Sequence, residues 1–338
     1  MAKTRVAING FGRIGRNAFK IAFERDDLEI VAVNDLTDNK TLAHLLRHDT
    51  NYGIYEHPVE ATEHGLTVND TPIAITSEPD PVKLPWSDLD VDVVIESTGR
   101  FRKPEQARAH VEAGAKRVII SAPLKGAGGT TVVLGVNDAD LDSGDEILSN
   151  ASCTTNCIAP PAAVIDVNFG IQKAMMTTIH SYTADQNLQD GPHRDLRRAR
   201  AAAQNIVPTT TGAAIAAAET LPQLSGIFDG MAIRVPTSVV SLSDFTFLLK
   251  RETTAEEIND AFREAAAMPM YQGILAVTDE PLVSSDFIGN SYSSIVDLEM
   301  TKVVDGDMAK VVAWYDNEWG YSNRLVEMVA DLGRLMSQ

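Results

Sequence analysis

The fold of this chain is decided by the stretch Asn9-Gly10-Phe11-Gly12-Arg13-Ile14-Gly15, which contains a Gly-x-Gly-x-x-Gly motif. The apolar residues 5–9 before it predict a buried strand, and the residues after it predict a helix to about residue 25. Residues 29–34 predict a second apolar strand. In such a strand–helix–strand unit the motif is typical of a dinucleotide-binding turn. A tight turn without a ligand is the alternative.

Each glycine has a physical task in such a turn. Gly10 permits a sharp bend, Gly12 lets the backbone approach a pyrophosphate, and Gly15 allows close packing of the helix, whose first amides face the anion. Asp35 ends the second strand, where a carboxylate can accept hydrogen bonds from both ribose hydroxyls and repel a 2′-phosphate. The sequence therefore favours NAD over NADP, unless Asp35 is only a solvated carboxylate at a strand end.

Strands and helices alternate through the first part of the chain. Strands are predicted at residues 91–96 and 117–121, with a helix from Pro104 to Gly114 between them. This alternation predicts a Rossmann-type, doubly wound parallel sheet. A hairpin is predicted at residues 65–75, with its turn at Asn69-Asp70.

The pattern changes near residue 152. A helix over residues 153–168 is followed by strand-like runs at residues 171–182, 231–236, 239–250, 291–300 and 308–315. We therefore expect an α/β fold, with a parallel sheet in residues 1–152 and an α+β domain with a mostly antiparallel sheet in residues 153–318. A C-terminal helix in residues 319–338 is expected to pack back on the first domain. Residues 183–208, rich in arginine, are predicted to form a long functional loop.

The composition of the chain excludes several classes of function. The 338 residues include 47 acidic and 29 basic ones, a formal net charge of −18, which repels nucleic-acid phosphates and anionic lipids. No apolar run approaches the ~20 residues of a membrane span, and no leader pattern is recognisable, so we expect a soluble intracellular protein. The only cysteines are Cys153 and Cys157, which fit neither a disulfide framework nor a zinc site.

Cys153 is a candidate nucleophile. Ser152 or Asn150 is a candidate helix cap, which would place the thiol at the positive end of a helix and lower its pKa. From the residues alone, a small buried side chain is the commoner explanation, and it is the one we retain for Cys157. His180 can be a partner only if the fold brings it to Cys153.

Five motifs together resemble one enzyme family. They are Asn9–Arg16, Ala151–Cys157, His180–Thr183, Thr211–Ala214 and Trp314–Tyr321. The chain resembles the phosphorylating glyceraldehyde-3-phosphate dehydrogenases over essentially its whole length, with the motifs in the same order and spacing. The resemblance implies a Rossmann domain, a catalytic domain and a homotetramer that works in the cytoplasm in glycolysis or gluconeogenesis.

The resemblance also implies roles for matching residues. Cys153 would attack the aldehyde, and His180 would act as base and later as acid. NAD would be bound by Gly10, Gly12, Arg13, Ile14, Gly15, Asp35, Ser121, Asn317 and Tyr321. The phosphate group of the substrate would meet Thr183, Asp185 and Arg234. The attacking inorganic phosphate would meet Ser152, Thr154, Thr211 and Gly212, with Arg198 nearby.

The implied reaction is the NAD-dependent oxidation and phosphorylation of D-glyceraldehyde 3-phosphate to 1,3-bisphosphoglycerate. It would pass through a thiohemiacetal and a thioester on Cys153, with hydride transfer to the nicotinamide and no metal. The partners would be glyceraldehyde 3-phosphate and inorganic phosphate, with no nucleic acid and no membrane.

Three other functions share part of this pattern. Erythrose-4-phosphate dehydrogenase shares the cysteine and the histidine but releases an acid, and residues 208–214 match the glyceraldehyde enzyme better. Acyl-phosphate reductases such as aspartate-semialdehyde dehydrogenase lack this cysteine motif. A thiol redox sensor would need Cys153 but neither Asn317 nor Tyr321.

Overall fold

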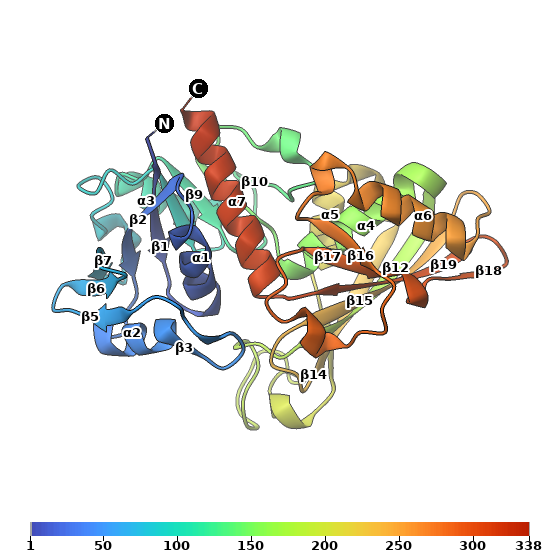
Figure 1. Cartoon of the computed structure of the whole chain (residues 1–338), viewed down its shortest axis with the longest axis horizontal. Helices are drawn as coiled ribbons and strands as arrows, with labels where there is room; N and C mark the ends of the chain where they lie inside the picture. Colours follow the sequence, from blue (N-terminus) through green and yellow to red (C-terminus); the bar gives the residue numbers. More distant parts are fainter. Residues whose placement is uncertain (1, 338) are drawn as a thin grey trace. The chain divides into compact units, whose positions relative to one another are not determined.

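The computed structural model describes residues 2–337, which divide into two compact units (Figure 1). The first unit contains the chain up to residue 132, residues 139–151 and the C-terminal residues from Ser322 onward. The second contains residues 133–138 and 152–321. Each unit is built on one large sheet.

The sheet of the first unit has the strand order β10-β11-β9-β8-β1-β2-β7-β6-β5. All neighbours from β10 to β7 are parallel, and only the β7-β6-β5 edge is antiparallel. The predicted doubly wound parallel sheet is therefore confirmed. Its strands are β1 (Thr4–Asn9), β2 (Leu28–Asn34), β5 (Val59–Ala61), β6 (Gly65–Val68), β7 (Thr71–Thr76), β8 (Val93–Glu96), β9 (Arg117–Ile120), β10 (Thr130–Thr131) and β11 (Ile147–Ser149).

Strand order reverses at β1, which lies between β2 and β8. Chain segments leave this point in opposite directions, so the carboxyl ends of β1, β2 and β8 border a crevice in which doubly wound sheets bind their ligands. The helices of this unit are α1 (Arg13–Phe23), α2 (Asn39–Arg47) and α3 (Pro104–Glu112), with most of α7 (Trp319–Met336). The predicted hairpin is confirmed: Asn69 and Asp70 both have positive φ, as a two-residue type I′ turn requires.

The central strands are apolar because both of their faces are covered. Ile8, Val33, Val94 and Ile119 are fully buried. Near the end of the chain, a Cβ at Gly333 on α7 would lie 2.0 Å from the Thr4 hydroxyl oxygen, so this helix packs against the start of β1.

The sheet of the second unit has the order β13-β14-β12-β15-β19-β17-β16, with β18 added on β19. Only the pairs β12/β14 and β16/β17 are parallel, so the expected mostly antiparallel sheet is confirmed. The strands are β12 (Ile171–Ser181), β13 (Val207–Thr210), β14 (Phe228–Val235), β15 (Ser241–Leu249), β16 (Leu275–Thr278), β17 (Ser294–Asp297), β18 (Lys302–Val304) and β19 (Met308–Tyr315).

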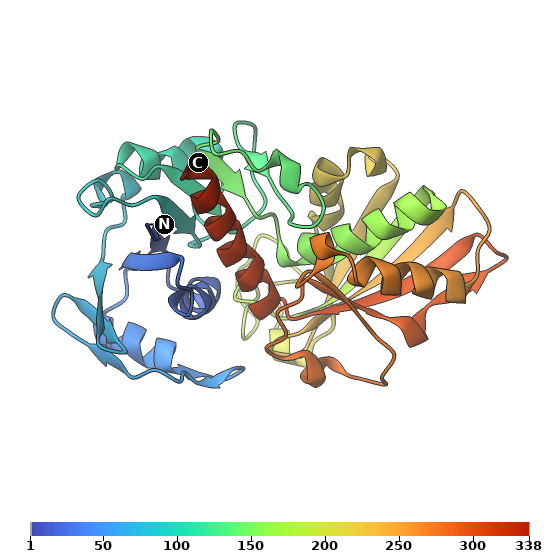
Figure 2. The same ribbon diagram turned by 45° about the horizontal axis from the view of Figure 1, so that its top comes forward.

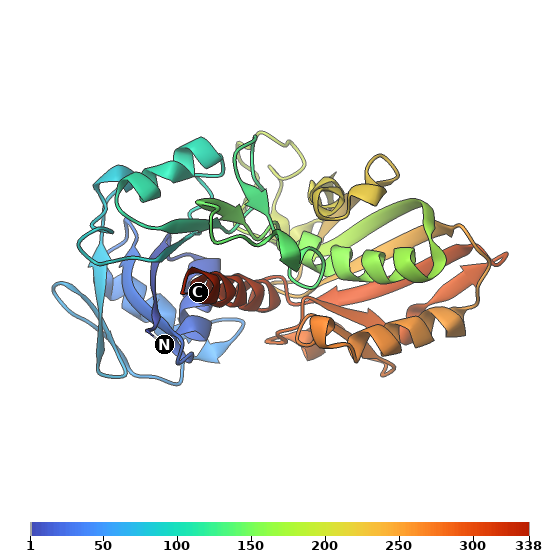
Figure 3. The ribbon, with the colours of Figure 1, turned by 90° about the horizontal axis from the view of Figure 1, so that it is seen from above.

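Helices α4 (Cys153–Phe169) and α6 (Ala255–Ala266) lie side by side on one face of this sheet (Figures 2 and 3), and α5 (Ala213–Thr220) packs against α4. Helix α6 begins in a capping box between Thr254 and Glu257. Two short strands, β3 (His48–Asp49) and β4 (Gly53–Ile54), pair with each other in a separate antiparallel ribbon. Within residues 2–337 no helix combines the length and apolar character needed to cross a membrane.

Candidate active site

The glycine motif has the geometry expected of it. Gly10 has φ +97°, and a Cβ there would lie 2.7 Å from the backbone nitrogen of Thr98. A Cβ on Gly15 would lie 2.1 Å from the carbonyl oxygen of Gly10, so helix α1 packs directly on the turn. A Cβ on Gly12 would meet nothing within 4 Å, and no side chain caps the helix there. The backbone at Gly12 is thus unobstructed at the start of α1, where a dinucleotide-binding turn meets its anion.

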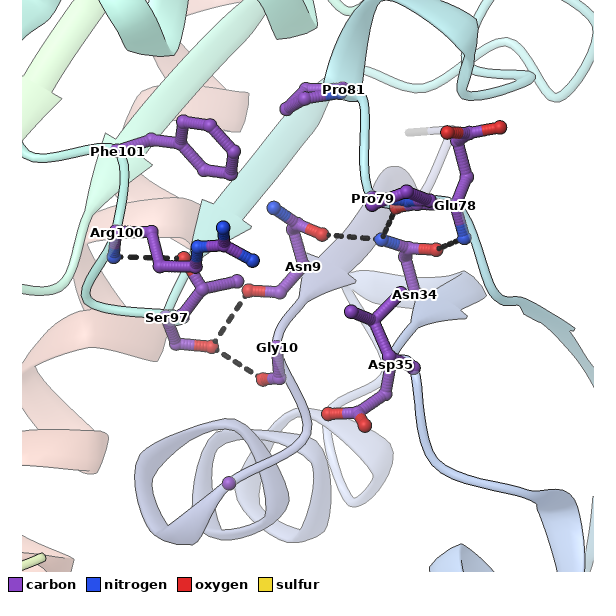
Figure 4. Close-up of a pocket in the computed structure, with 13 residues that line it drawn as sticks. Asn9, Gly10, Asn34, Asp35, Glu78, Pro79, Pro81, Ser97, Arg100 and Phe101 are labelled. Carbon is purple, nitrogen blue, oxygen red and sulfur yellow. Dashed lines mark hydrogen bonds between the residues drawn. The ribbon is translucent and has the colours of Figure 1, made fainter.

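A cavity of about 290 Å³ opens at the carboxyl ends of β1, β2 and β8 (Figure 4). Gly10, Gly12 and Asp35 all line it. The Asp35 carboxylate accepts hydrogen bonds from the backbone nitrogens of Phe11 (2.8 Å) and Thr37 (3.0 Å), which hold it in place. An unobstructed glycine at the start of a helix and a fixed carboxylate fit a dinucleotide.

The other expected cofactor residues lie in both units. In the first, Arg13 forms an ion pair with Asp49, Ile14 follows it on α1, and the half-buried Ser121 follows β9. In the second, Asn317 is buried and accepts a hydrogen bond from the Ser241 hydroxyl (2.8 Å), and Tyr321 is also buried.

Cys153 is the first residue of α4. The Ser152 hydroxyl accepts a hydrogen bond from the backbone nitrogen of Thr155 (3.0 Å), which confirms Ser152 as the cap. The Cys153 sulfur lies 3.6 Å from Nε2 of His180, near the end of β12. The fold therefore brings together the two residues whose pairing the sequence left open.

His180 is oriented from its other nitrogen. Nδ1 lies 2.7 Å from the carbonyl oxygen of Ser181, and because a carbonyl only accepts, Nδ1 donates. The lone pair of Nε2 then faces the thiol of Cys153. Arg234 is paired with His180 in the register of β12 and β14, and its Nη1 donates to the same Ser181 carbonyl oxygen (3.1 Å). Its 3.0 Å approach to Nδ1 is a contact between two donors that share this carbonyl.

Burial controls the charges of this pair. Burial, aided by the charge of Arg234, lowers the pKa of His180 to about 3, so the imidazole is neutral at pH 7. Burial raises the pKa of the Cys153 thiol, and the nearby charge of Arg234 opposes that rise only in part. The expected lowering of this pKa by the helix end is therefore wrong for this structure, since desolvation outweighs it. A neutral base beside a protonated thiol is an arrangement for general-base activation.

The expected anion-binding residues form two groups. In the first group, Nη1 of Arg234 donates to the hydroxyl oxygen of Thr183 (3.4 Å). Asp185 instead forms an ion pair with Arg198, which also donates to the Thr209 hydroxyl (3.0 Å) and the Thr210 carbonyl oxygen (3.0 Å).

The remaining expected phosphate residues lie at helix starts in the second unit. Thr154 is the second residue of α4, Thr211 accepts a hydrogen bond from the backbone nitrogen of Ala213 (3.2 Å), and Gly212 is the N-cap of α5.

Tyr315 lies in the Trp314–Tyr321 motif, but the sequence alone indicated no role for it. Its hydroxyl lies between those of Thr154 (3.0 Å) and Thr178 (2.9 Å), and its ring meets that of His180 edge-on at 6.0 Å between centroids. The one feature of the sequence that could have indicated this position is a tyrosine at the end of an apolar strand. Cys157 is fully buried beside Ser243, and burial raises the pKa of its thiol to about 12, as expected of a core residue.

Among residues 2–337 no cluster of three or more His, Cys, Asp or Glu side chains could hold a metal ion.

Comparison with known proteins assigns the family. Residues 4–104 match the family model "Glyceraldehyde 3-phosphate dehydrogenase, NAD binding domain", and residues 152–317 match "Glyceraldehyde 3-phosphate dehydrogenase, C-terminal domain". The chain is 54% identical over 327 residues to glyceraldehyde-3-phosphate dehydrogenase of Geobacillus stearothermophilus, covering 96% of this chain and 97% of the relative. It is 53% identical over 328 residues to glyceraldehyde-3-phosphate dehydrogenase 1 of Bacillus cereus (97% and 98%) and 54% identical over 337 residues to the Mycobacterium avium enzyme (98% and 98%). The chain therefore belongs to the glyceraldehyde 3-phosphate dehydrogenase family.

Proposed function

We propose that the protein catalyses the NAD-dependent oxidation and phosphorylation of D-glyceraldehyde 3-phosphate to 1,3-bisphosphoglycerate. The observation that carries the proposal is the Cys153–His180 pair, 3.6 Å apart and flanked by Arg234, in a member of this family. When bound, NAD supplies the acceptor for the hydride removed from the substrate. Gly10, Gly12, Arg13, Ile14, Gly15, Asp35, Ser121, Asn317 and Tyr321 would hold it.

Cys153 and His180 perform the covalent steps. The sulfur attacks the aldehyde carbon, the C–S bond forms, and the thiol proton passes through Nε2 of His180 to the aldehyde oxygen. Nε2 then accepts the proton of the thiohemiacetal hydroxyl as the carbon is oxidised, which leaves a thioester on Cys153. Such proton transfer contributes about 10²–10⁴-fold to a rate.

Phosphate completes the reaction. An oxygen of inorganic phosphate attacks the thioester carbon, the C–S bond breaks, and His180 returns a proton to the sulfur. We assign the acceptor phosphate to Ser152, Thr154, Thr211 and Gly212, with Arg198 beside them. The phosphate group of the aldehyde is assigned to Thr183 and Arg234, and Asp185 acts here through its ion pair with Arg198.

We also infer the wider setting of the enzyme. Residues 1–152 would form the NAD-binding domain, residues 153–318 the catalytic domain and residues 319–338 the returning helix. We propose a cytoplasmic homotetramer that binds neither nucleic acid nor membrane. The net charge of −18 disfavours both of those partners. Exposed Leu188, Leu196 and Ile206 support an interface between subunits.

The test compares two aldehydes. NADH formation is followed with glyceraldehyde 3-phosphate and with erythrose 4-phosphate, each with and without inorganic phosphate. We expect a clear preference for glyceraldehyde 3-phosphate and a steady rate that requires phosphate. Preference for erythrose 4-phosphate with phosphate-independent turnover would overturn the proposal.

A further inference from the structure

A buried polar chain lies beneath the nucleotide cavity of the first unit, and none of the steps above uses it. Its centre is Glu96 at the end of β8, a carboxylate that is 2% exposed. One carboxylate oxygen accepts from the backbone nitrogen of Thr98 (2.9 Å) and from the Thr98 hydroxyl. The other accepts from Nδ2 of Asn9 and from Nε2 of His110 (3.1 Å). Hydrogen-bond donors therefore reach both oxygens of this carboxylate, which is buried away from solvent.

Trp86 fixes the proton on His110. The indole Nε1 of the fully buried Trp86 lies 3.0 Å from Nδ1 of His110, which is also fully buried. Because an indole N–H can only donate, Nδ1 accepts, and the proton of the neutral imidazole must be on Nε2. His110 therefore donates to Glu96. The 3.3 Å approach of Asn9 Nδ2 to the same ring nitrogen is a contact between two donors that share the carboxylate.

The carboxylate in turn orients the amides that border the cavity. With Nδ2 of Asn9 directed to Glu96, its Oδ1 accepts from Nδ2 of Asn34 (2.7 Å). Asn34 Oδ1 is then directed to the backbone nitrogen of Glu78 (2.9 Å), as Figure 4 shows. Asn9, Asn34, Glu78 and Thr98 all line the cavity, whereas Glu96, His110 and Trp86 do not.

We propose that Glu96 and His110 are positioning residues for the adenosine half of NAD. The buried carboxylate fixes the ends of β1, β2 and β8 and the Glu78 segment in the geometry that binds the nucleotide. The inference rests on the proposed function, because it takes NAD as the ligand of this cavity. Burying a carboxylate costs desolvation free energy, and four hydrogen-bond donors offset that cost here.

The direct test is Glu96→Gln, which keeps the shape and removes the charge. The single nitrogen of the new amide must face donors, either those of His110 and Asn9 or those of Thr98, so the hydrogen bonds on one side of residue 96 are lost. We expect the dissociation constants for NAD and for ADP-ribose, measured by calorimetry, to rise at least about tenfold, since hydrogen bonds to charged groups contribute ~1.5–3 kcal/mol. We expect kcat at saturating NAD to stay within about threefold of the parent value, because Cys153 and His180 lie in the other unit.

The matched control is Asp297→Asn in the second unit. Asp297 is also a buried carboxylate, 4% exposed, and it also accepts from an indole nitrogen, that of Trp314 (3.1 Å). We expect it to leave NAD affinity unchanged. Parent-like affinity in Glu96→Gln, or equal losses in both variants, would overturn the inference. Failure of the parent protein to bind NAD at all would instead overturn the proposed function.

Trp86→Phe provides a second, milder test if Glu96→Gln does not fold. It keeps an aromatic ring but removes the N–H that fixes His110, together with part of the buried indole. We expect the imidazole nitrogen signals of His110 in NMR spectra to show altered protonation, and the dissociation constant for ADP-ribose to rise several-fold. Unchanged nitrogen signals together with unchanged affinity would contradict the positioning role.

Discussion

The sharpest prediction concerns Arg234, which has two separable tasks in this account. Its guanidinium lies 3.0 Å from Nδ1 of His180, where it influences the base, and it is assigned to the phosphate group of the substrate. The variant Arg234→Leu removes both. One charge-assisted hydrogen bond to phosphate contributes ~1.5–3 kcal/mol, which is a factor of about 10 to 150 in kcat/KM.

The assay compares glyceraldehyde 3-phosphate with glyceraldehyde, which lacks the phosphate group. Any effect that reaches the chemistry through His180 changes both substrates and cancels in the ratio of their kcat/KM values. We therefore expect the preference for the phosphorylated substrate to fall about 10- to 150-fold in Arg234→Leu for each such bond lost. Arg197→Leu, an exposed arginine on the same long loop as Arg198, is the control, and its ratio should match that of the parent.

A fall of equal size for both substrates would refute this reasoning. Arg234 would then act only on His180, and the phosphate group of the aldehyde would have to be bound elsewhere.

Three further predictions concern the nucleophile, the cofactor and the acceptor. Substoichiometric iodoacetamide should label Cys153 far faster than Cys157, because the Cys157 thiol is fully buried and its pKa is raised to about 12. Cys153→Ser should abolish turnover while NAD binding persists. Label found mainly on Cys157 by mass spectrometry would contradict the assignment. Asp35→Gly should raise kcat/KM with NADP relative to NAD, and equal efficiency of the parent with both coenzymes would remove the basis for this change. Thr211→Ala should raise the KM for inorganic phosphate more than that for the aldehyde, and the reverse order in steady-state kinetics would reassign Thr211.

The first unit was largely predictable because its signals are local. Gly10, Gly12 and Gly15 each occupy a position where the backbone of the turn favours glycine. The Asn69-Asp70 turn requires two residues at positive φ. The parallel strands are apolar on both faces, so they appear in the sequence as continuous runs of apolar residues.

The prediction was incomplete in both units. In the first, the helix α2 and the short strands β3, β4, β5, β10 and β11 were missed. In the second, the strands β13, β16 and β18 and the helices α5 and α6 were missed. The strand β13 contains Pro208, which weakens a strand signal and is tolerated because β13 is the edge of its sheet. The alanine-rich α5 has no amphipathic period, because most of its residues are buried. The predicted strand over residues 291–300 is shorter in the structure, as β17 ends at Asp297 and a 3₁₀ turn follows.

The candidate site was likewise predictable where its signals are local and not where they depend on tertiary packing. The sequence indicated Cys153 and its cap, but the position of His180 beside it depends on how α4 packs against β12, which no local pattern encodes. The pKa of Cys153 was misjudged because the helix end is visible in the sequence, whereas the desolvation that outweighs it is a property of the packed site. Tyr315 was missed for a related reason, since its partners Thr154 and Thr178 come from distant parts of the chain.

The central claim is that Cys153 carries a thioester that phosphate, and not water, resolves. The most direct measurement mixes the NAD-loaded enzyme with glyceraldehyde 3-phosphate in phosphate-free buffer and follows NADH on the millisecond scale. We predict a burst on the order of one NADH per active site, followed by near-arrest. Mass spectrometry of the quenched enzyme should show the acyl group on Cys153, and adding phosphate should restore steady turnover. Continuous turnover without phosphate, or an acyl group on any other residue, would contradict the account.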